Sequence, residues 1–301
     1  MQQTILNTLF QLHNVTTEQA KATFLQNLQT PALDVWRAFR AFPVRVNYTR
    51  QDIQSVYMLR YFPPYSQIIK IILNALHHNP GHLPFNGQTI GASFIGCGPS
   101  PEIYGFFEFL NSTAFRPQQV KVNTFDIYSD HWAFSRNITF QSLIPRVWNH
   151  SPILPTNNNL NIASHNSLQP FATAFQNSNL VVFQNCLNEI PENLHNVVRN
   201  NLKTIIDNIP RGAVILIIDL LGYQPVLDLL AYLEDDTELI QSVEILRSSR
   251  QGEQSYDARE LVNAIPPIVR QHFLTGIPFQ VENGLIPRRY IKYHHLTMRK
   301  R

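Results

Sequence analysis

The stretch Gly91–Glu102, GASFIGCGPSPE, decides the fold. It overlaps a short apolar run, Thr89–Ile95, that predicts a strand, and it leads into Pro101–Leu110, which predicts a helix. The glycines Gly96 and Gly98 between them allow a positive φ and let a ligand approach the backbone closely. The following amides face such a ligand, and a helix N-terminus favours negatively charged groups. The stretch therefore predicts a ligand-binding turn between a strand and a helix.

Strands and helices alternate along the rest of the chain. Further strands are expected at Val120–Ile127, Leu160–Ala163, Leu180–Gln184, Ala213–Leu220, Ser242–Arg247 and Arg289–Met298, and helices at Pro191–Asn208, Val226–Leu233 and Pro266–Phe273. Such alternation is typical of an α/β protein with a Rossmann-like, doubly wound, mainly parallel sheet and helices on both faces. With Thr89–Ile95 the sheet has seven strands. The last two are candidates for an antiparallel addition.

The first 85 residues have a different pattern. Apolar residues at three- and four-residue spacing predict helices at Ala20–Leu28, Ala32–Phe42 and Tyr65–His77, the first of them opened by Thr17. We therefore divide the chain into a helical accessory or cap segment, residues 1–85, and an α/β domain, residues 86–301.

Composition narrows the class of protein. Hydrophobic residues make up 44% and charged residues 15% of the chain, which suits a packed globular core. No apolar run approaches the roughly 20 residues that span a bilayer, and no signal peptide is evident, so we expect a cytoplasmic protein with no membrane partner. The two cysteines, Cys97 and Cys186, form no CxxC pair. They are expected to be free thiols, and no metal site is expected.

The net charge is only +3, and the basic residues gather near the C-terminus at Arg288, Arg289, Lys292, Arg299, Lys300 and Arg301. We interpret them as a solvated edge strand and tail. Contact with nucleic acid stays open as a weaker alternative.

Other polar residues follow the predicted strands. Asp126 ends the strand after the glycine turn, where a carboxylate can accept both hydroxyls of a ribose. Asn185, Asn188 and Glu189 follow a later strand and are expected at the same sheet edge. Pro101 stands where a dinucleotide-binding fingerprint has its third glycine.

In order and spacing these segments resemble the class I S-adenosylmethionine-dependent methyltransferases from about residue 88 onward. GCGPSPE is similar to that family's glycine-rich motif and FDIYSDHW to its acidic second motif, while NLVVFQNCLNEI and RGAVILIIDL resemble its fourth and fifth strands. The resemblance implies that S-adenosylmethionine is the cofactor. It implies ribose binding by Asp126, adenine contacts by Ile127 and Asn166, and support of the loop by Glu102. The other implied cofactor residues are Gly96, Cys97, Gly98, Pro99, Asn185 and Cys186.

Methyl transfer needs alignment of an acceptor with the methyl–sulfur bond, and a weakly acidic acceptor also needs a general base. Glu189 and His131 are the first candidates for that base, with Asp130 and His195 behind them. The stretch Tyr57–Tyr65 resembles a segment that precedes the domain in mitoribosome-associated methyltransferase-like proteins. This resemblance adds Tyr65 as a candidate catalytic residue.

Two alternatives remain. A nicotinamide-dependent oxidoreductase is disfavoured by the missing third glycine. A methyltransferase-like fold that only binds or assembles is kept open by the asparagines at positions that are often acidic. The sequence leaves the methyl acceptor open between a small molecule, RNA and a protein.

Overall fold

A twisted sheet forms the centre of the computed structural model, which describes residues 1–85, 87–274 and 289–301. Its strands are β1 (Thr89–Ile95), β2 (Gln119–Asp126), β3 (Ile153–Asn159), β4 (Leu180–Gln184), β5 (Val214–Leu220), β6 (Val243–Arg247), β7 (Gln254–Asp257) and β8 (Tyr290–Lys300). They lie in the order β3-β2-β1-β4-β5-β8-β6. Neighbours among β1–β5 pair in parallel, and β8 pairs antiparallel with β5 and β6. The predicted mainly parallel, seven-stranded sheet is confirmed, with β7 added beside β8.

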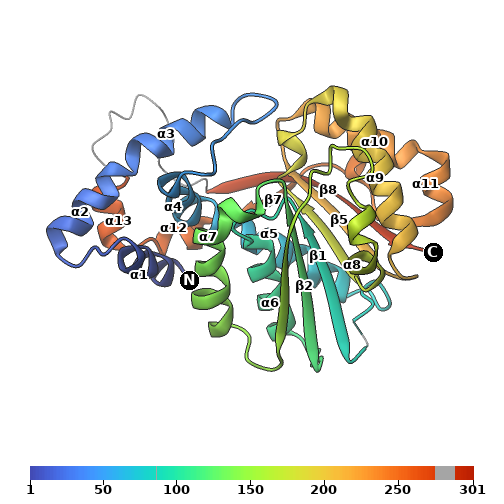
Figure 1. Ribbon diagram of the computed structural model, residues 1–301, viewed down its shortest axis with the longest axis horizontal. Coiled ribbons are helices and arrows are strands. Elements are labelled where there is room, and N and C mark those ends of the chain that lie inside the picture. The colour runs from blue at the N-terminus through green and yellow to red at the C-terminus, as the bar shows by residue number, and fades with distance from the viewer. Residues whose placement is uncertain (86, 275–288) are drawn as a thin grey trace.

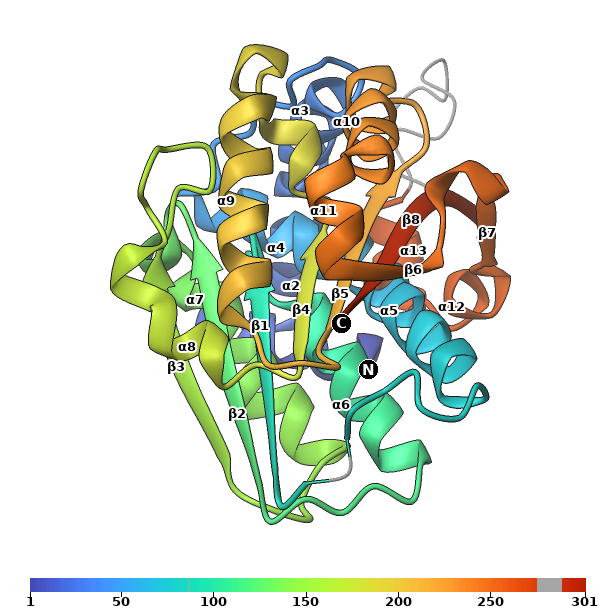
Figure 2. The ribbon, with the colours of Figure 1, turned by 90° about the vertical axis from the view of Figure 1, so that its right-hand side faces the viewer.

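Helices cover both faces of this sheet, as predicted. Figures 1 and 2 show α5 and α6 on one face and α8 and α9 on the other. The helices are α1 (Gln2–Leu12), α2 (Glu18–Asn27), α3 (Gln29–Ala38), α4 (Gln51–Arg60), α5 (Phe62–His77), α6 (Pro101–Ser112), α7 (Ala133–Asn137), α8 (Ala172–Gln176), α9 (His195–Asn208), α10 (Gln224–Asp235), α11 (Thr237–Ser242), α12 (Arg259–Asn263) and α13 (Pro267–His272).

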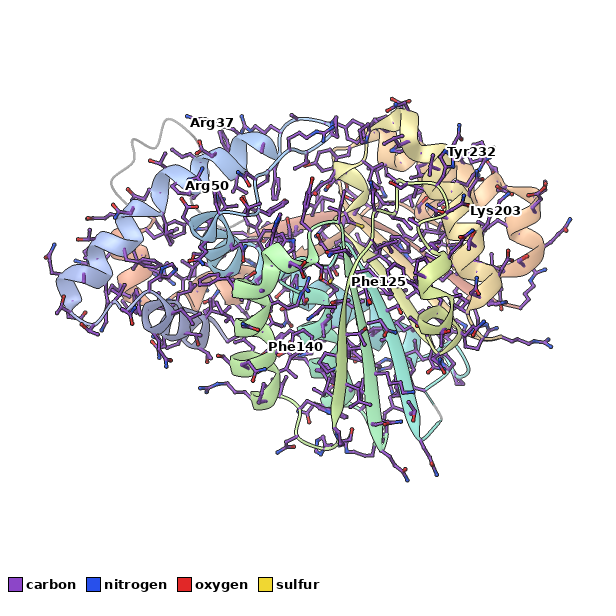
Figure 3. The ribbon with its side chains drawn as sticks, viewed as in Figure 1. Arg37, Arg50, Phe125, Phe140, Lys203 and Tyr232 are labelled. Carbon is purple, nitrogen blue, oxygen red and sulfur yellow. The ribbon has the colours of Figure 1, made fainter. Side chains whose placement is uncertain are left out.

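The main hydrophobic core lies between the sheet and these helices. Every residue of β4 and β5 is buried, as expected for strands covered on both faces. Phe125 of β2, labelled in Figure 3, stacks on Phe175 of α8 with ring centroids 5.2 Å apart. On the other face α5 and α6 cross closely at Gly105, where a Cβ would lie 2.0 Å from the carbonyl oxygen of Ser66.

A second cluster of buried side chains joins the N-terminal helices to a segment far away in sequence. Helices α1–α4 and α13 contribute to it, and Figure 1 shows α2 and α3 beside α13 at one end of the molecule. Trp132, which follows β2, packs into the same cluster. The N-terminal helices are thereby fixed next to the carboxyl ends of the strands.

Several local predictions need correction. Leu160–Ala163 is not a strand; the third strand is β3, whose polar sequence ILPTNNN lies on the sheet edge and lacks an apolar pattern. The helix predicted to reach Phe42 ends at Ala38. Among the strands that the structure describes, β8 alone runs against the sheet, because β6 pairs antiparallel with β8 and so has the same direction as β5.

The predicted basic edge strand is also wrong, because β8 lies between β5 and β6. Lys292 contacts Glu253 at 2.6 Å, Arg299 donates to Glu244 at 3.1 Å, and Lys300 donates to the carbonyl oxygens of Asp207 and Ile209. Arg288 lies outside the described residues. The side chains of Lys292, Arg299 and Lys300 are thus engaged within the protein.

Candidate functional site

A cavity of about 560 Å³ opens at the carboxyl ends of the parallel strands. The last residues of β1, β2, β4 and β5 all line it: Ile95, Asp126, Gln184 and Leu220. This is where open α/β sheets bind ligands. The cavity brings together most of the residues predicted from the sequence: Gly96, Cys97, Gly98, Pro99, Glu102, Asp126, Ile127, Asn185, Cys186, Glu189 and Tyr65.

The glycine turn forms one wall of the cavity. Gly96 and Gly98 have φ values of 64° and 45°, and Ser100, which precedes α6, also has a left-handed backbone with φ of 69°. A Cβ on Gly96 would lie 2.3 Å from the Cβ of Cys186, so this position has no room for a side chain. The turn lines the cavity with Gly96, Cys97, Gly98 and Pro99.

Asp126 is fixed beside this turn. Its Oδ2 accepts the amide of Gly98 and its Oδ1 accepts the amide of Tyr128, both at 3.0 Å. Burial raises the pKa of this carboxyl, while the two amides and Arg136 oppose that shift. The Trp132 side chain also donates to this carboxyl. A carboxylate has about four acceptor positions, so Asp126 can still accept a hydroxyl group from a ligand in the cavity.

An apolar edge lies next to Asp126. Ile127 and Tyr128 are 46% and 53% exposed, unusual values for large apolar side chains, and both line the cavity. Leu160 and Ile162 line it as well, and the amide of Leu160 donates to the carbonyl oxygen of Asp126. This group of side chains can contact a flat, apolar ring.

Arg136 of α7 supports the glycine turn from behind, and the sequence analysis missed it. The buried guanidinium donates to the carbonyl oxygen of Gly98 at 3.3 Å, to Ser129 at 2.8 Å and to Asn157 at 3.0 Å. It thereby joins the glycine turn to the segment after β2 and to β3. Arg136 lies just beyond the FDIYSDHW motif, and no pattern in the sequence singles it out.

We expect Arg136→Met to destabilise the protein by about 1.5–3 kcal/mol, because the buried carbonyl oxygen of Gly98 and the buried Ser129 hydroxyl lose a charged donor. It should also weaken binding of a ligand at the glycine turn, although Arg136 does not line the cavity. Urea denaturation and ligand titration measure the two effects. The matched control is Arg146→Met, since Arg146 is exposed and donates to one nearby carbonyl oxygen. Equal effects of the two substitutions would contradict the proposed supporting role.

Several polar atoms next to the cavity have no partner among the described residues. They are Glu102 Oε1, Gln184 Oε1 and both side-chain atoms Oδ1 and Nδ2 of Asn185. Burial raises the pKa of the Glu102 carboxyl well above its usual value. Unpaired buried polar groups are rare in folded proteins, so these atoms indicate a ligand that supplies the missing hydrogen bonds.

Glu189 lies in the same cavity on the short 3₁₀ turn Leu187–Glu189. Its Oε1 accepts the Tyr48 hydroxyl at 2.8 Å. Burial raises the pKa of Glu189 to about 8, an effect that the Tyr48 hydrogen bond opposes. The neighbouring Asn188 donates to Asp219 at 3.0 Å, which anchors this turn to the end of β5. Glu189 is thus a partly buried carboxyl whose pKa is raised to about 8.

Aromatic rings from the N-terminal segment cover this part of the cavity. Tyr48 packs on Trp132 with ring centroids 4.6 Å apart, and Tyr57 lies 6.1 Å from Tyr65 and 6.0 Å from Trp132. The buried Gln54 fixes the arrangement by donating to the carbonyl oxygens of Tyr48 and His131. No pattern in the sequence indicates a role for Tyr48 or Gln54, since a single tyrosine in a connecting segment belongs to no motif or periodic run.

Some predicted residues lie elsewhere. His131 is exposed and stacks on Tyr128, but it does not line the cavity. Asn166 is exposed with φ of 56° and is also absent from the lining, where Ile162 and Ala163 of the same segment appear. Asp130 and His195 do not line the cavity either.

No group of three histidine, cysteine or acidic side chains is arranged to hold a metal ion in the described ranges. Within the same ranges, none of the helices has the length and apolar character that crossing a membrane requires.

Comparisons with known proteins find likeness in structure alone. The sequence matches no protein-family model and no curated protein. Among solved structures, the chain is similar to a SAM-dependent methyltransferase from Anabaena variabilis, with 10% identity and a TM-score of 0.44, over 93% of this chain and 95% of that one. It is also similar to the N-methyltransferase NodS from Bradyrhizobium japonicum in complex with S-adenosylhomocysteine, with 10% identity and a TM-score of 0.41, over 84% and 99% of the two chains.

A third similar structure is the plantazolicin methyltransferase BpumL, with 11% identity and a TM-score of 0.43 over 92% and 98% of the two chains. The mainly parallel sheet and the position of the glycine turn at its carboxyl edge agree with the expectation from the sequence. The chain has a Rossmann-like α/β fold, with a mainly parallel sheet covered by helices on both faces (Figures 1 and 2).

Proposed function

We propose that this protein is an S-adenosylmethionine-dependent methyltransferase that acts on a small molecule. One observation carries the proposal: a single cavity joins a glycine turn and a strand-end carboxylate to a partly buried Glu189 beneath aromatic rings. The glycine turn and the carboxylate suit an adenosyl cofactor, and the region around Glu189 suits a methyl acceptor.

The residues present fit the cofactor. The wall at Gly96 has no room for a Cβ, and Asp126 retains acceptor capacity for ribose hydroxyls. Ile127 and Tyr128 offer an apolar edge for adenine. When bound, the cofactor supplies an activated methyl group on a sulfonium. Glu102 and Asn185 offer unpaired polar atoms to its amino-acid part.

The lining of the cavity favours a small acceptor over nucleic acid. Three carboxyl groups, those of Glu102, Asp126 and Glu189, line it, and Arg45 is the one lysine or arginine among the lining residues that the structure describes. A phosphate backbone requires the opposite balance of charge. The aromatic cover formed by Tyr48, Tyr57 and Tyr65 also limits access to the cavity.

Glu189 is the candidate general base in this proposal. Its carboxyl has a pKa raised by desolvation to about 8, close to the pH at which a base is most effective. Tyr65 contributes to the wall and orients the acceptor. His131 stays a candidate only if the acceptor reaches beyond the cavity lining.

Two assays test the proposal. A thermal-shift comparison of S-adenosylhomocysteine with NADH should show stabilisation by the former alone; stabilisation by NADH alone would favour an oxidoreductase. Transfer of a radiolabelled methyl group into the small-molecule fraction of a cell extract tests activity. Cofactor binding without transfer to any fraction would favour the non-catalytic alternative.

The pH dependence of kcat/KM provides a further prediction. A base must be deprotonated, so kcat/KM should rise as the pH increases through about 8 and then level off. The charged or titratable groups that affect Glu189 are Tyr48, Asp126, Asp219 and Arg45. Tyr48→Phe removes a hydrogen bond that favours the carboxylate, so the rise should move to higher pH. An unchanged profile in both Tyr48→Phe and Glu189→Gln would exclude Glu189 as the base.

A further inference from the structure

The cavity has an excess of acidic groups that the proposed cofactor does not balance. Glu102, Asp126 and Glu189 line it, and Asp219 lies directly behind the Glu189 turn. Arg45, the basic lining residue among those described, is exposed at the cavity edge. S-adenosylmethionine carries one net positive charge at neutral pH. A second cation in the cavity would favour the ionised form of the carboxyl groups whose pKa burial raises.

Most of the unpaired polar atoms in the site are acceptors, so they require hydrogen-bond donors from a ligand. Among the described residues, Glu102 Oε1, Gln184 Oε1 and Asn185 Oδ1 are buried acceptors without a partner, against one donor atom, Asn185 Nδ2. An ammonium group carries up to three donors and no acceptor, whereas a hydroxyl, thiol or carboxylate brings acceptors of its own. Since Glu102 and Asn185 are assigned to the amino-acid part of the cofactor, Gln184 Oε1 is the unpaired acceptor left for a second ligand, and it requires a donor.

The aromatic cover provides faces that attract a cation. Tyr48 and Tyr57 lie against Trp132, with centroid separations of 4.6 Å and 6.0 Å. All three rings line the cavity, and Glu189 is hydrogen-bonded to Tyr48 at their edge. Cation–π attraction is strongest for indole and phenol faces from which water is excluded. A positive group between these rings and Glu189 would contact both.

We infer that the methyl acceptor is the nitrogen of a small amine, bound between Glu189 and the rings of Tyr48, Tyr57 and Trp132. This inference rests on the proposed function. The bound ammonium first gives a proton to the Glu189 carboxylate, which leaves a lone pair on nitrogen. That lone pair forms the bond to the methyl carbon, the carbon–sulfur bond breaks, and its electron pair stays on sulfur as S-adenosylhomocysteine forms. The products are a methylammonium and a protonated Glu189, whose proton then passes to water.

The raised pKa of Glu189 is consistent with this step. A carboxyl with a pKa of about 8 lies much closer to an ammonium group in proton affinity than an ordinary glutamate does. Proton transfer between the two is therefore less unfavourable than transfer to an exposed carboxylate.

The inference is tested by the binding of three compounds that share a phenyl group and differ in their terminal polar group. We would first saturate the protein with S-adenosylhomocysteine, whose failure to bind would refute the proposed function itself. Calorimetry then compares phenethylamine, 2-phenylethanol and 3-phenylpropionate. The amine is expected to bind about tenfold or more tightly than the alcohol, and the acid is expected to bind least. Glu189→Gln should reduce the preference for the amine, and Glu192→Gln, an exposed neighbour outside the cavity lining, should leave it unchanged.

The charge of the methylated product that forms in a cell extract provides a second test. Label transferred from radiolabelled S-adenosylmethionine into an extract should reside in small molecules that a cation exchanger retains at pH 7. Label in neutral or acidic products, in base-labile esters or in macromolecules would overturn the inference. Equal binding of the three phenyl compounds, tighter binding of the acid, or no binding of any of them to the saturated protein would overturn it as well.

Discussion

Asp126→Ala is expected to weaken binding of S-adenosylhomocysteine by roughly 10- to 150-fold, which corresponds to about 1.5–3 kcal/mol. The carboxylate is the proposed acceptor for the ribose hydroxyls. It also accepts the amides of Gly98 and Tyr128, so its loss leaves the glycine turn less well fixed. Isothermal titration calorimetry measures the change directly.

The matched control for this variant is Asp130→Ala. Asp130 lies in the next turn, is exposed, and does not line the cavity. Its replacement should change the affinity less than twofold by this account. Asp126→Asn separates the two roles of the carboxylate, since an amide keeps one acceptor oxygen and the shape of the side chain. An Asp126→Ala protein that is folded and binds with unchanged affinity would refute the ribose assignment.

Gly96→Ala is expected to cost about 2–5 kcal/mol of folding free energy and to abolish measurable cofactor binding. A left-handed backbone with φ of 64° costs a non-glycine residue roughly 1–2 kcal/mol. The added Cβ would also lie 2.3 Å from the Cβ of Cys186, and such overpacking costs about 1–3 kcal/mol more. Urea denaturation followed by calorimetry of the folded fraction gives both quantities.

Gly212→Ala separates the backbone contribution from the steric one. Gly212 has a φ of 83°, and an added Cβ there would meet no atom within 4 Å. It should therefore show the backbone cost alone, with cofactor binding retained. Adding Cys186→Gly to Gly96→Ala removes the clashing Cβ and should recover part of the stability. Equal losses in Gly96→Ala and Gly212→Ala would show that the contact with Cys186 does not restrict the turn.

The sequence predicted the part of the site that depends on strand ends. Gly96, Asp126 and Glu189 follow buried strands with clear apolar patterns, and parallel strands bring their carboxyl ends to one edge of the sheet. Their shared position could therefore be inferred without a structure. The strand β3 was placed wrongly because its exposed, asparagine-rich sequence carries no periodicity.

The cover of the cavity could not be predicted in the same way. Tyr48 reaches Glu189 because the chain turns after α3 and packs against the segment that follows β2, an arrangement between residues far apart in sequence. Arg136 contributes through three hydrogen bonds to separate segments. Such contacts depend on tertiary packing, and no local spacing of residues in the sequence predicts them.

Calorimetric titration of the wild-type protein with S-adenosylhomocysteine tests the central claim most directly. The cavity at the glycine turn, with Asp126 fixed beside it, predicts binding of one molecule per chain with an affinity that falls in Asp126→Ala and persists in Asp130→Ala. A well-folded protein that shows no binding at millimolar ligand would contradict the assignment of this cavity to an adenosyl cofactor, and with it the proposed methyl transfer.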